Sequence, residues 1–290
     1  MNTPIHGLDI HMEGIVHLYP SQEGDVVALR GVDLDVEAGE EFALLGPSGS
    51  GKSTILALLS GLHRPSAGRI RMGEYDLGRL SSSQLLRLRA TEVSLVLQDP
   101  ARNLLPYATA AQNVEFAQRG ARARGHRPPF GARELLEQLG MGNLAHRTVA
   151  TLSGGEQQRV AIATGTAPAP RLLLVDEPTS QLDTRSRDQV VALLAQINHT
   201  LGATVVSVTH DPEVGAAMPR TVTIRDGRIG AEGRRGQEFA VVGKDGSVQL
   251  PPDVLEKLPP GTLLRVRRHA SGVDLQSPEL EPQEMPPGDS

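Results

Sequence analysis

The fold is decided by Gly46-Pro47-Ser48-Gly49-Ser50-Gly51-Lys52-Ser53, which is followed by Thr54. This stretch matches the pattern G-x-x-x-x-G-K-S/T and lies between an apolar run at residues 40–45 and a helical pattern at residues 53–60. A strand, a glycine loop and a helix in this order form a phosphate cradle, because backbone N–H groups point inward and the helix N-terminus adds positive potential. We therefore predict an α/β fold in which this loop and Thr54 bind nucleotide phosphates, Lys52 supplies a charge and Ser53 holds Mg²⁺.

A second apolar run ends in two carboxylates. Leu172-Leu173-Leu174-Val175 is followed by Asp176 and Glu177. Asp176 is expected to hold Mg²⁺ through water, and Glu177 is expected to accept a proton from an attacking water. An Asp-Glu pair after a strand is common by itself, but beside a phosphate loop it predicts phosphoryl chemistry. A kinase, a GTPase and an ATPase are all compatible with these two features.

Apolar periodicity places these motifs in a larger frame. Strand patterns at residues 172–175 and 203–209 flank a helical pattern at residues 185–201, which predicts a parallel sheet with helices on both faces. Residues 10–36 show short alternating runs broken by turn residues, which is typical of antiparallel strands. Residues 81–166 are mostly helical in pattern.

A proline-rich interruption of that helical region carries four arginines. A solvated loop between helices is the favoured interpretation, and an anion- or partner-binding surface is the alternative. The four residues are Arg119, Arg122, Arg124 and Arg127.

Composition excludes several classes of protein. The 290 residues carry 29 basic and 34 acidic side chains, a net charge of −5, which argues against a nucleic-acid partner held by phosphate contacts. The absence of cysteine excludes a disulfide scaffold, a thiolate zinc site and a cysteine nucleophile. No apolar run approaches the length of a membrane span, and the first residues do not read as a signal peptide. A cytoplasmic location is therefore expected.

The segment Leu152-Ser153-Gly154-Gly155-Glu156-Gln157-Gln158 resembles the signature of the ATP-binding subunits of ABC transporters. The resemblance extends over about residues 8–233, in which all motifs follow the family's order. It implies an ATPase that uses ATP and Mg²⁺. It also implies a P-loop NTPase core of the RecA-like type, with an antiparallel β subdomain and a helical subdomain at about residues 98–166.

The resemblance implies further roles around the phosphate loop. Tyr19 is similar to the aromatic residue that stacks on adenine, a contact that costs little side-chain entropy. Gln98 resembles the glutamine that reaches Mg²⁺ and the attacking water, and it opens the helical subdomain that touches a membrane permease. His210 resembles the histidine that contacts the γ-phosphate and orients Glu177. The catalytic set implied is Glu177, His210 and Gln98.

The signature itself implies a second subunit. Ser153, Gly154, Gly155 and Glu156 begin a helix whose N-terminus is expected to bind the γ-phosphate of a nucleotide held by another copy. Asp183 is expected to communicate across that contact. The resemblance thus implies a head-to-tail homodimer with two ATP molecules between the subunits.

Residues after Gln98 are similar to ATPases of the MacB and LolD type, which act in macrolide export and lipoprotein release. Such subunits lie at the inner face of the membrane and drive permeases that have few spans and a large extracytoplasmic domain. An importer subunit is an alternative, and a soluble protein acting on ribosomes or DNA is a more remote one. The residues concerned are Asn103-Leu104-Leu105-Pro106, Thr109 and Gln112-Asn113-Val114.

Residues 234–270 are expected to form a small β-rich module. Alternating runs flank the turn Gly243-Lys244-Asp245-Gly246, a strong hairpin signal, and the region resembles the swapped hairpin of AbrB-type regulators. Its few basic residues are interleaved with acidic ones, which favours dimerisation or a regulatory contact over DNA binding, and a nucleotide-gated regulator is the remaining alternative. Residues 271–290 are acidic and proline-rich and are expected to be disordered.

Overall fold

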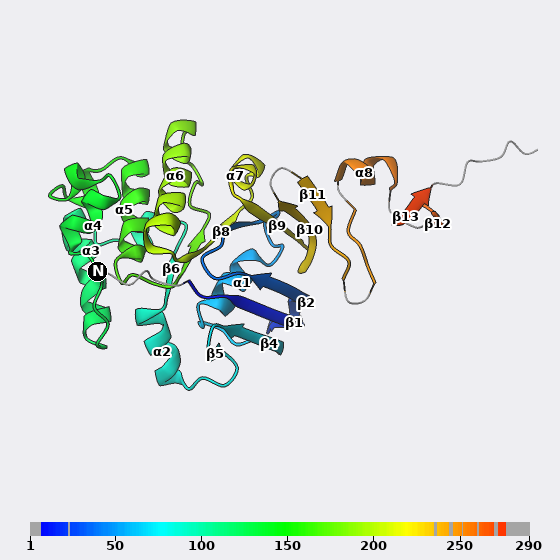
Figure 1. Ribbon diagram of the computed structural model, residues 1–290, viewed down its shortest axis with the longest axis horizontal. Helices are drawn as coiled ribbons and strands as arrows, with labels where there is room; N and C mark the ends of the chain where they lie inside the picture. Colours follow the sequence, from blue (N-terminus) through cyan, green and yellow to red (C-terminus); the bar gives the residue numbers. More distant parts are fainter. Residues whose placement is uncertain are drawn as a thin grey trace, which may run out of the picture.

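The computed structural model describes residues 7–22, 24–234, 237–243, 246–250, 252–259, 261–269 and 272–276. Figure 1 shows two β-sheets at the centre of the molecule, a group of helices on one side and the last elements of the chain on the other. The turn residues Lys244 and Asp245 and residues 277–290 lie outside the described residues, so the predictions made for them stay predictions.

The central sheet has seven strands in the order β11-β10-β9-β3-β8-β7-β6. The five strands from β9 to β6 run parallel, and β10 and β11 are antiparallel additions at one edge. Because β7 and β3 flank β8, the residues that follow these three strands meet at one edge of the sheet. The strands are β3 (Glu41–Leu45), β6 (Val93–Val96), β7 (Leu172–Asp176), β8 (Thr204–Thr209), β9 (Arg220–Arg225), β10 (Arg228–Arg234) and β11 (Gln237–Ala240).

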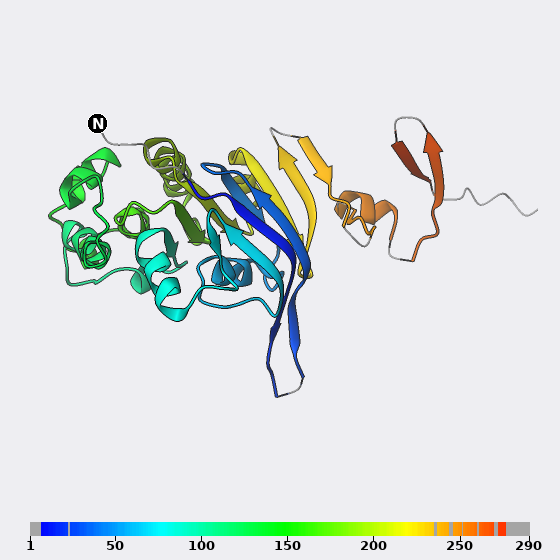
Figure 2. The ribbon, with the colours of Figure 1, turned by 60° about the horizontal axis from the view of Figure 1, so that its bottom comes forward.

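A second, four-stranded sheet confirms the antiparallel strands expected near the N-terminus. Ile10 pairs with Val36, and the register runs along most of both strands. The β1–β2 hairpin projects beyond the rest of the molecule (Figure 2). The strands, in the order β2-β1-β4-β5, are β1 (Ile10–Tyr19), β2 (Val26–Val36), β4 (Ala67–Met72) and β5 (Tyr75–Asp76).

Helices cover both faces of the central sheet, as the strand and helix alternation predicts. Alternate strand residues point to opposite faces, so Leu173 belongs to one apolar core and Leu174 to the other. The first core is shared with α3, α5 and α6, and the second with α1, α2 and the antiparallel sheet. The helices of this body are α1 (Lys52–Leu59), α2 (Ser82–Thr91), α3 (Ala110–Arg122), α4 (Ala132–Gln138), α5 (Gly154–Thr166), α6 (Thr184–Leu201) and α7 (Pro212–Ala217), with 3₁₀ turns η1 (Pro100–Arg102), η2 (Gly142–Leu144) and η3 (Val149–Thr151).

One strand interrupts the region that the pattern assigns to helices. β6 pairs in parallel with β7 and forms the far edge of the sheet. A Cβ atom on Gly165 of α5 would lie 2.4 Å from a methyl group of Val96, so the missing side chain allows the helix to approach β6 closely. The mostly helical interpretation of residues 81–166 is therefore wrong at this strand, which has only four residues.

The arginine-rich interruption begins later than expected, because α3 continues through Arg122. Arg119 pairs with Glu115 one turn earlier at 2.9 Å, and Arg122 donates to Gln118 at 2.9 Å. Arg124 donates to the carbonyl of Gly120. These local partners favour a solvated helix end over a binding surface.

The expected boundary near residue 233 does not coincide with the end of the sheet, because β11 pairs with β10. Ala240 lies opposite Ala231 at one end of this pairing, and Gln237 lies opposite Arg234 at the other. Beyond it, Val242 and Val248 form an antiparallel bridge, as a hairpin requires. The helix α8 (Pro252–Lys257) and the strands β12 (Arg265–His269) and β13 (Gly272–Gln276) follow, and they extend away from the body (Figure 1). In the described part of the chain, no helix combines the length and apolarity needed to cross a membrane.

Candidate nucleotide-binding site

The glycine loop joins β3 to α1, as the sequence predicts. Gly49 and Gly51 have φ values of 78° and 107°, in the region that favours glycine. A Cβ atom on Gly46 would lie 2.2 Å from the carbonyl oxygen of Ile224 on β9. The loop can therefore curl tightly against the sheet only with glycine at these positions.

Lys52 is buried at the start of α1 and lies across this loop. Its ammonium group donates to the carbonyl oxygens of Gly46 at 2.6 Å and Pro47 at 3.0 Å. The same Nζ atom lies 3.8 Å from Oε1 of Glu177. A positive charge is thus fixed at the mouth of the loop, within reach of an anion bound there.

Ser53 and Asp176 face each other. The Ser53 hydroxyl lies 3.5 Å from both carboxylate oxygens of Asp176, which ends β7. Burial raises the pKa of Asp176, and the charge of the neighbouring Glu177 raises it further. A cation beside this carboxylate would offset both effects, since it favours the ionised form.

Glu177 and His210 form the closest pair of titratable groups in the site. Oε2 of Glu177 lies 2.8 Å from Nδ1 of His210, which follows β8. The Glu177 side chain is 13% exposed, whereas that of His210 is 58% exposed. The Glu177 backbone has φ 45°, and its N–H donates to the carbonyl of Val208 at 2.9 Å. The neighbouring strand β8 thus fixes the backbone of Glu177, and His210 fixes its carboxylate.

Gln98 and Tyr19 lie at the margins of the site. Gln98 follows β6, and its amide donates to the hydroxyl of Ser180 at 3.1 Å. Tyr19 ends β1, is half-buried, and its hydroxyl lies 3.4 Å from that of Thr54. The ring of His17 meets the ring of Tyr19 edge-on with centroids 4.7 Å apart, so the tyrosine is supported from one side.

A single cavity of about 310 Å³, the nucleotide cavity below, brings most of the predicted residues together. Ala28 on β2 also lines it, a contribution for which the sequence carries no signal, because it depends on how the antiparallel sheet packs on the loop. The predicted residues that line this cavity are Ser48, Gly49, Gly51, Lys52, Ser53, Thr54, Gln98, Asp176, Glu177 and His210.

The signature residues do not line this cavity. Ser153 is the N-cap of α5 and forms a capping box with Glu156, whose carboxylate also pairs with Arg147 at 3.0 Å. The hydrogen bond from the Ser153 backbone lowers the pKa of Glu156. Ser153 and Gly154 are exposed, so the start of α5 faces outward within one chain.

Asp183 lies beside the signature. It is the N-cap of α6 and accepts from the backbone N–H of Ser186 at 2.9 Å, a bond that lowers the pKa of Asp183. A Cβ atom on Gly155 would lie 2.7 Å from the hydroxyl of Ser186, so the starts of α5 and α6 are adjacent. Asp183 and the signature together form a surface separate from the nucleotide cavity.

Comparison with known proteins gives consistent matches. A family model described as ABC transporter matches residues 29–180. The lipoprotein-releasing system ATP-binding protein LolD of Anaeromyxobacter dehalogenans is 43% identical over 234 residues, which cover 80% of this chain and 97% of that protein. The macrolide export ATP-binding/permease protein MacB 1/2 of Paracoccus denitrificans is 43% identical over 233 residues, and the match spans 34% of its length.

A solved structure supports the same relationship. The dimeric ATP-binding cassette MJ0796, in a post-hydrolysis state bound to ADP and Pi, superposes with a TM-score of 0.68 at 32% identity. The match covers 79% of this chain and all of that one.

Proposed function

The chain belongs to the ABC transporter family, and from this membership and the geometry of its nucleotide cavity we propose that it hydrolyses ATP to drive a membrane permease. Within the family, we propose the MacB and LolD type. The 43% identity to members of both groups supports this assignment.

One observation carries the proposal: Glu177 pairs with His210 at 2.8 Å in the same cavity that Lys52, Ser53 and Asp176 line. Glu177 accepts the proton of the attacking water, and His210 holds the carboxylate oriented toward it. Lys52 neutralises charge on the β- and γ-phosphates. Gln98 positions the water from the edge of the helical subdomain.

The residues present fit Mg²⁺ bound with ATP. The Ser53 hydroxyl and the Asp176 carboxylate supply oxygen atoms 3.5 Å apart, the ligand type that Mg²⁺ prefers. Bound there, Mg²⁺ supplies positive charge to the transferring phosphoryl group.

We propose that Tyr19 stacks on the adenine ring and that two chains assemble head to tail. The exposed N-terminus of α5, with Ser153 and Gly154, then binds the γ-phosphate held by the partner subunit, and Asp183 lies at the same contact. The separation of this surface from the cavity within one chain supports a dimer, as does the dimeric state of MJ0796.

We further propose that the ATPase domain occupies residues 1–233, with its helical subdomain at about 98–166, and that an AbrB-like module and a terminal tail follow. In this division β11 of the module adds an edge strand to the sheet of the ATPase domain. The protein is expected at the cytoplasmic face of the membrane, held there by its permease. The description of MacB as an ATP-binding/permease protein supports a permease partner.

A pull-down tests the finer assignment. Tagged Glu177→Gln protein with ATP is incubated with detergent-solubilised membranes of its source, and partners are identified by mass spectrometry. Lys52→Ala protein is the control, because it should not form the closed, ATP-bound dimer. A permease with few spans and a large outer domain is expected. A multi-span permease with a solute-binding protein would indicate an importer, and ribosomal or DNA-associated partners alone would contradict the transport function.

A further inference from the structure

Residues 237–243 and 246–250, called the C-terminal extension here, pack against the ATPase body. β11 pairs with β10, and the backbone N–H of Val241 donates to the carbonyl of Gly230 at 3.0 Å. A Cβ atom on Gly230 would lie 2.2 Å from Oε1 of Gln249, so the Gln249 side chain packs directly on this glycine. The Gln249 amide also faces the carbonyl of Arg225 at 3.5 Å. The extension thus lies against β9 and β10.

This packing forms one side of a second cavity of about 310 Å³, partly open to solvent, which we call the extension cavity. Gln249 and Leu250 of the extension line it together with Gly46 and Pro47 of the phosphate loop. Pro212 at the start of α7 and strand residues of β9 and β10 complete the lining. Its volume lies at the lower end of the about 300–1,000 Å³ typical of small-molecule sites, and most of its lining is apolar.

His210 connects the two cavities. Among the described residues it is the one side chain that lines both the nucleotide cavity and the extension cavity. Its Nδ1 atom pairs with Glu177, while the residue also borders the extension cavity. A molecule bound in the extension cavity would therefore lie beside the residue that orients Glu177.

Arg225 gives the extension cavity its charge. It is partly buried in the lining, next to Thr223 on the same face of β9. Within the described ranges, no carboxylate lies within ion-pair distance of its guanidinium group. A cation of this kind at the wall of a mostly apolar cavity suits a ligand with an apolar body and one anionic group, since the guanidinium pairs a carboxylate in two-pronged geometry.

We propose that the extension cavity binds a small amphipathic carboxylate and that this ligand regulates ATP hydrolysis through His210. The binding step stands apart from the proposed function, whereas the effect on turnover rests on it. Nucleotide and carboxylate should then influence each other's binding reciprocally, because both contact His210.

Titration of the full-length protein with sodium octanoate, followed by calorimetry, tests the binding step, and 1-octanol serves as the uncharged probe. Saturable octanoate binding is expected, with octanol much weaker. Arg225→Gln should weaken octanoate binding about tenfold or more, because it removes a charge-assisted contact. Leu250→Trp should abolish binding by filling the cavity, and Arg87→Gln, an exposed arginine on α2, should leave it unchanged.

Absence of saturable octanoate binding, or binding that survives both Arg225→Gln and Leu250→Trp, would overturn the site. The regulatory step predicts that saturating octanoate changes kcat for ATP at least twofold in the wild type and not in Arg225→Gln. Unchanged kcat would overturn regulation through His210. A protein that binds octanoate but never hydrolyses ATP would instead contradict the proposed function.

Discussion

Glu177 adopts a backbone conformation that few residues with a side chain tolerate, with φ 45°. Such a conformation costs of the order of 1–3 kcal/mol and persists where the surroundings enforce it. Here the hydrogen bond to Val208 and the contact with His210 do so. This conformation ends the strand before Glu177, and the Glu177 side chain lines the nucleotide cavity.

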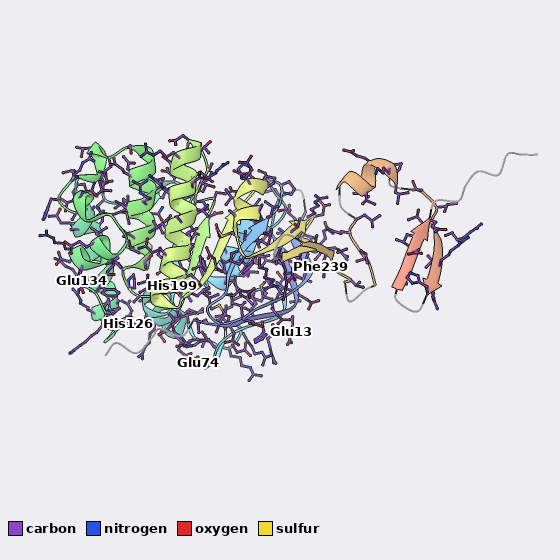
Figure 3. The ribbon with its side chains drawn as sticks, turned by 45° about the horizontal axis from the view of Figure 1, so that its top comes forward. Glu13, Glu74, His126, Glu134, His199 and Phe239 are labelled. Atoms are coloured by element: carbon purple, nitrogen blue, oxygen red, sulfur yellow. The ribbon has the colours of Figure 1, made fainter. Side chains whose placement is uncertain are left out.

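Replacement of His210 by alanine removes the one side chain within hydrogen-bond distance of the Glu177 carboxylate among the described residues. We expect kcat to fall about a hundredfold, because the base loses its orientation, while the loss in ATP affinity is much smaller than the loss in kcat. Steady-state ATPase assays and nucleotide titration measure the two effects. His199→Ala, on the exposed face of α6 and labelled in Figure 3, is the matched control. Equal kcat in both variants would exclude the orienting role.

Sequence alone could predict the phosphate loop residue by residue, because glycine, lysine and serine at these spacings have one common structural context. The pairing of Glu177 with His210 follows from periodicity only as far as both residues end neighbouring strands. Their roles came from the family resemblance. Ala28 and Gln249 could not be foreseen, because each contributes through packing between elements far apart in the chain.

At the scale of elements, β3 carries both the phosphate loop and a buried carboxylate at its first residue. Glu41 is 8% exposed and lies where β3 pairs with β8. Burial raises the pKa of Glu41 from 4.5 to about 7. Its ionisation therefore opposes folding: the cost is absent below the unfolded-state pKa, grows as pH rises from 4.5, and is complete above about pH 7.

Glu41→Gln should raise the free energy of unfolding at pH 8 by about 1–3 kcal/mol, because the neutral amide escapes this ionisation cost. At pH 5 the gain should shrink to less than about 1 kcal/mol, since the folded carboxyl is then neutral and only the unfolded one has begun to ionise. Urea denaturation at the two pH values measures the difference, with exposed Glu134→Gln on α4 as the control (labelled in Figure 3). A gain of equal size at both pH values would contradict the effect of burial.

The elements that the sequence predicts well are those with clear boundaries. The helix expected at residues 53–60 is α1, Lys52–Leu59, and the strand expected at residues 172–175 is β7, Leu172–Asp176. β6 escapes such a pattern because its strand character depends on pairing with β7, which periodicity does not reveal. The alternating run expected before the turn at Gly243 falls on β11, but that pattern does not predict its pairing with β10. The side chain of Phe239 on β11 is 50% exposed, and it lies at the edge of the sheet from which the last elements of the chain extend (Figure 3).

At the scale of the whole molecule, the nucleotide cavity and the signature surface are separate within one chain. A head-to-tail dimer joins the cavity of each chain to the signature of the other, so both sites are composite. Neither chain would then hydrolyse ATP without its partner.

Mixing two inactive variants tests this arrangement. Lys52→Ala disables the cavity, and Ser153→Arg disables the signature, so each homodimer should be inactive. In mixed dimers one of the two sites combines intact parts, so an equal mixture should regain roughly a quarter of the wild-type rate. Circular dichroism confirms that both variants fold. A mixture as inactive as its components would contradict composite sites.

The measurement that bears most directly on ATP hydrolysis by this chain compares Glu177→Gln with the wild type, by ATPase assay and by size-exclusion chromatography with ATP and Mg²⁺. The isosteric amide cannot accept the proton of the attacking water, so hydrolysis should fall at least about a hundredfold while ATP still binds. The variant should therefore accumulate as a stable ATP-bound dimer. Near-normal turnover without such a dimer would show that Glu177 is not the base and that the cavity does not work as proposed.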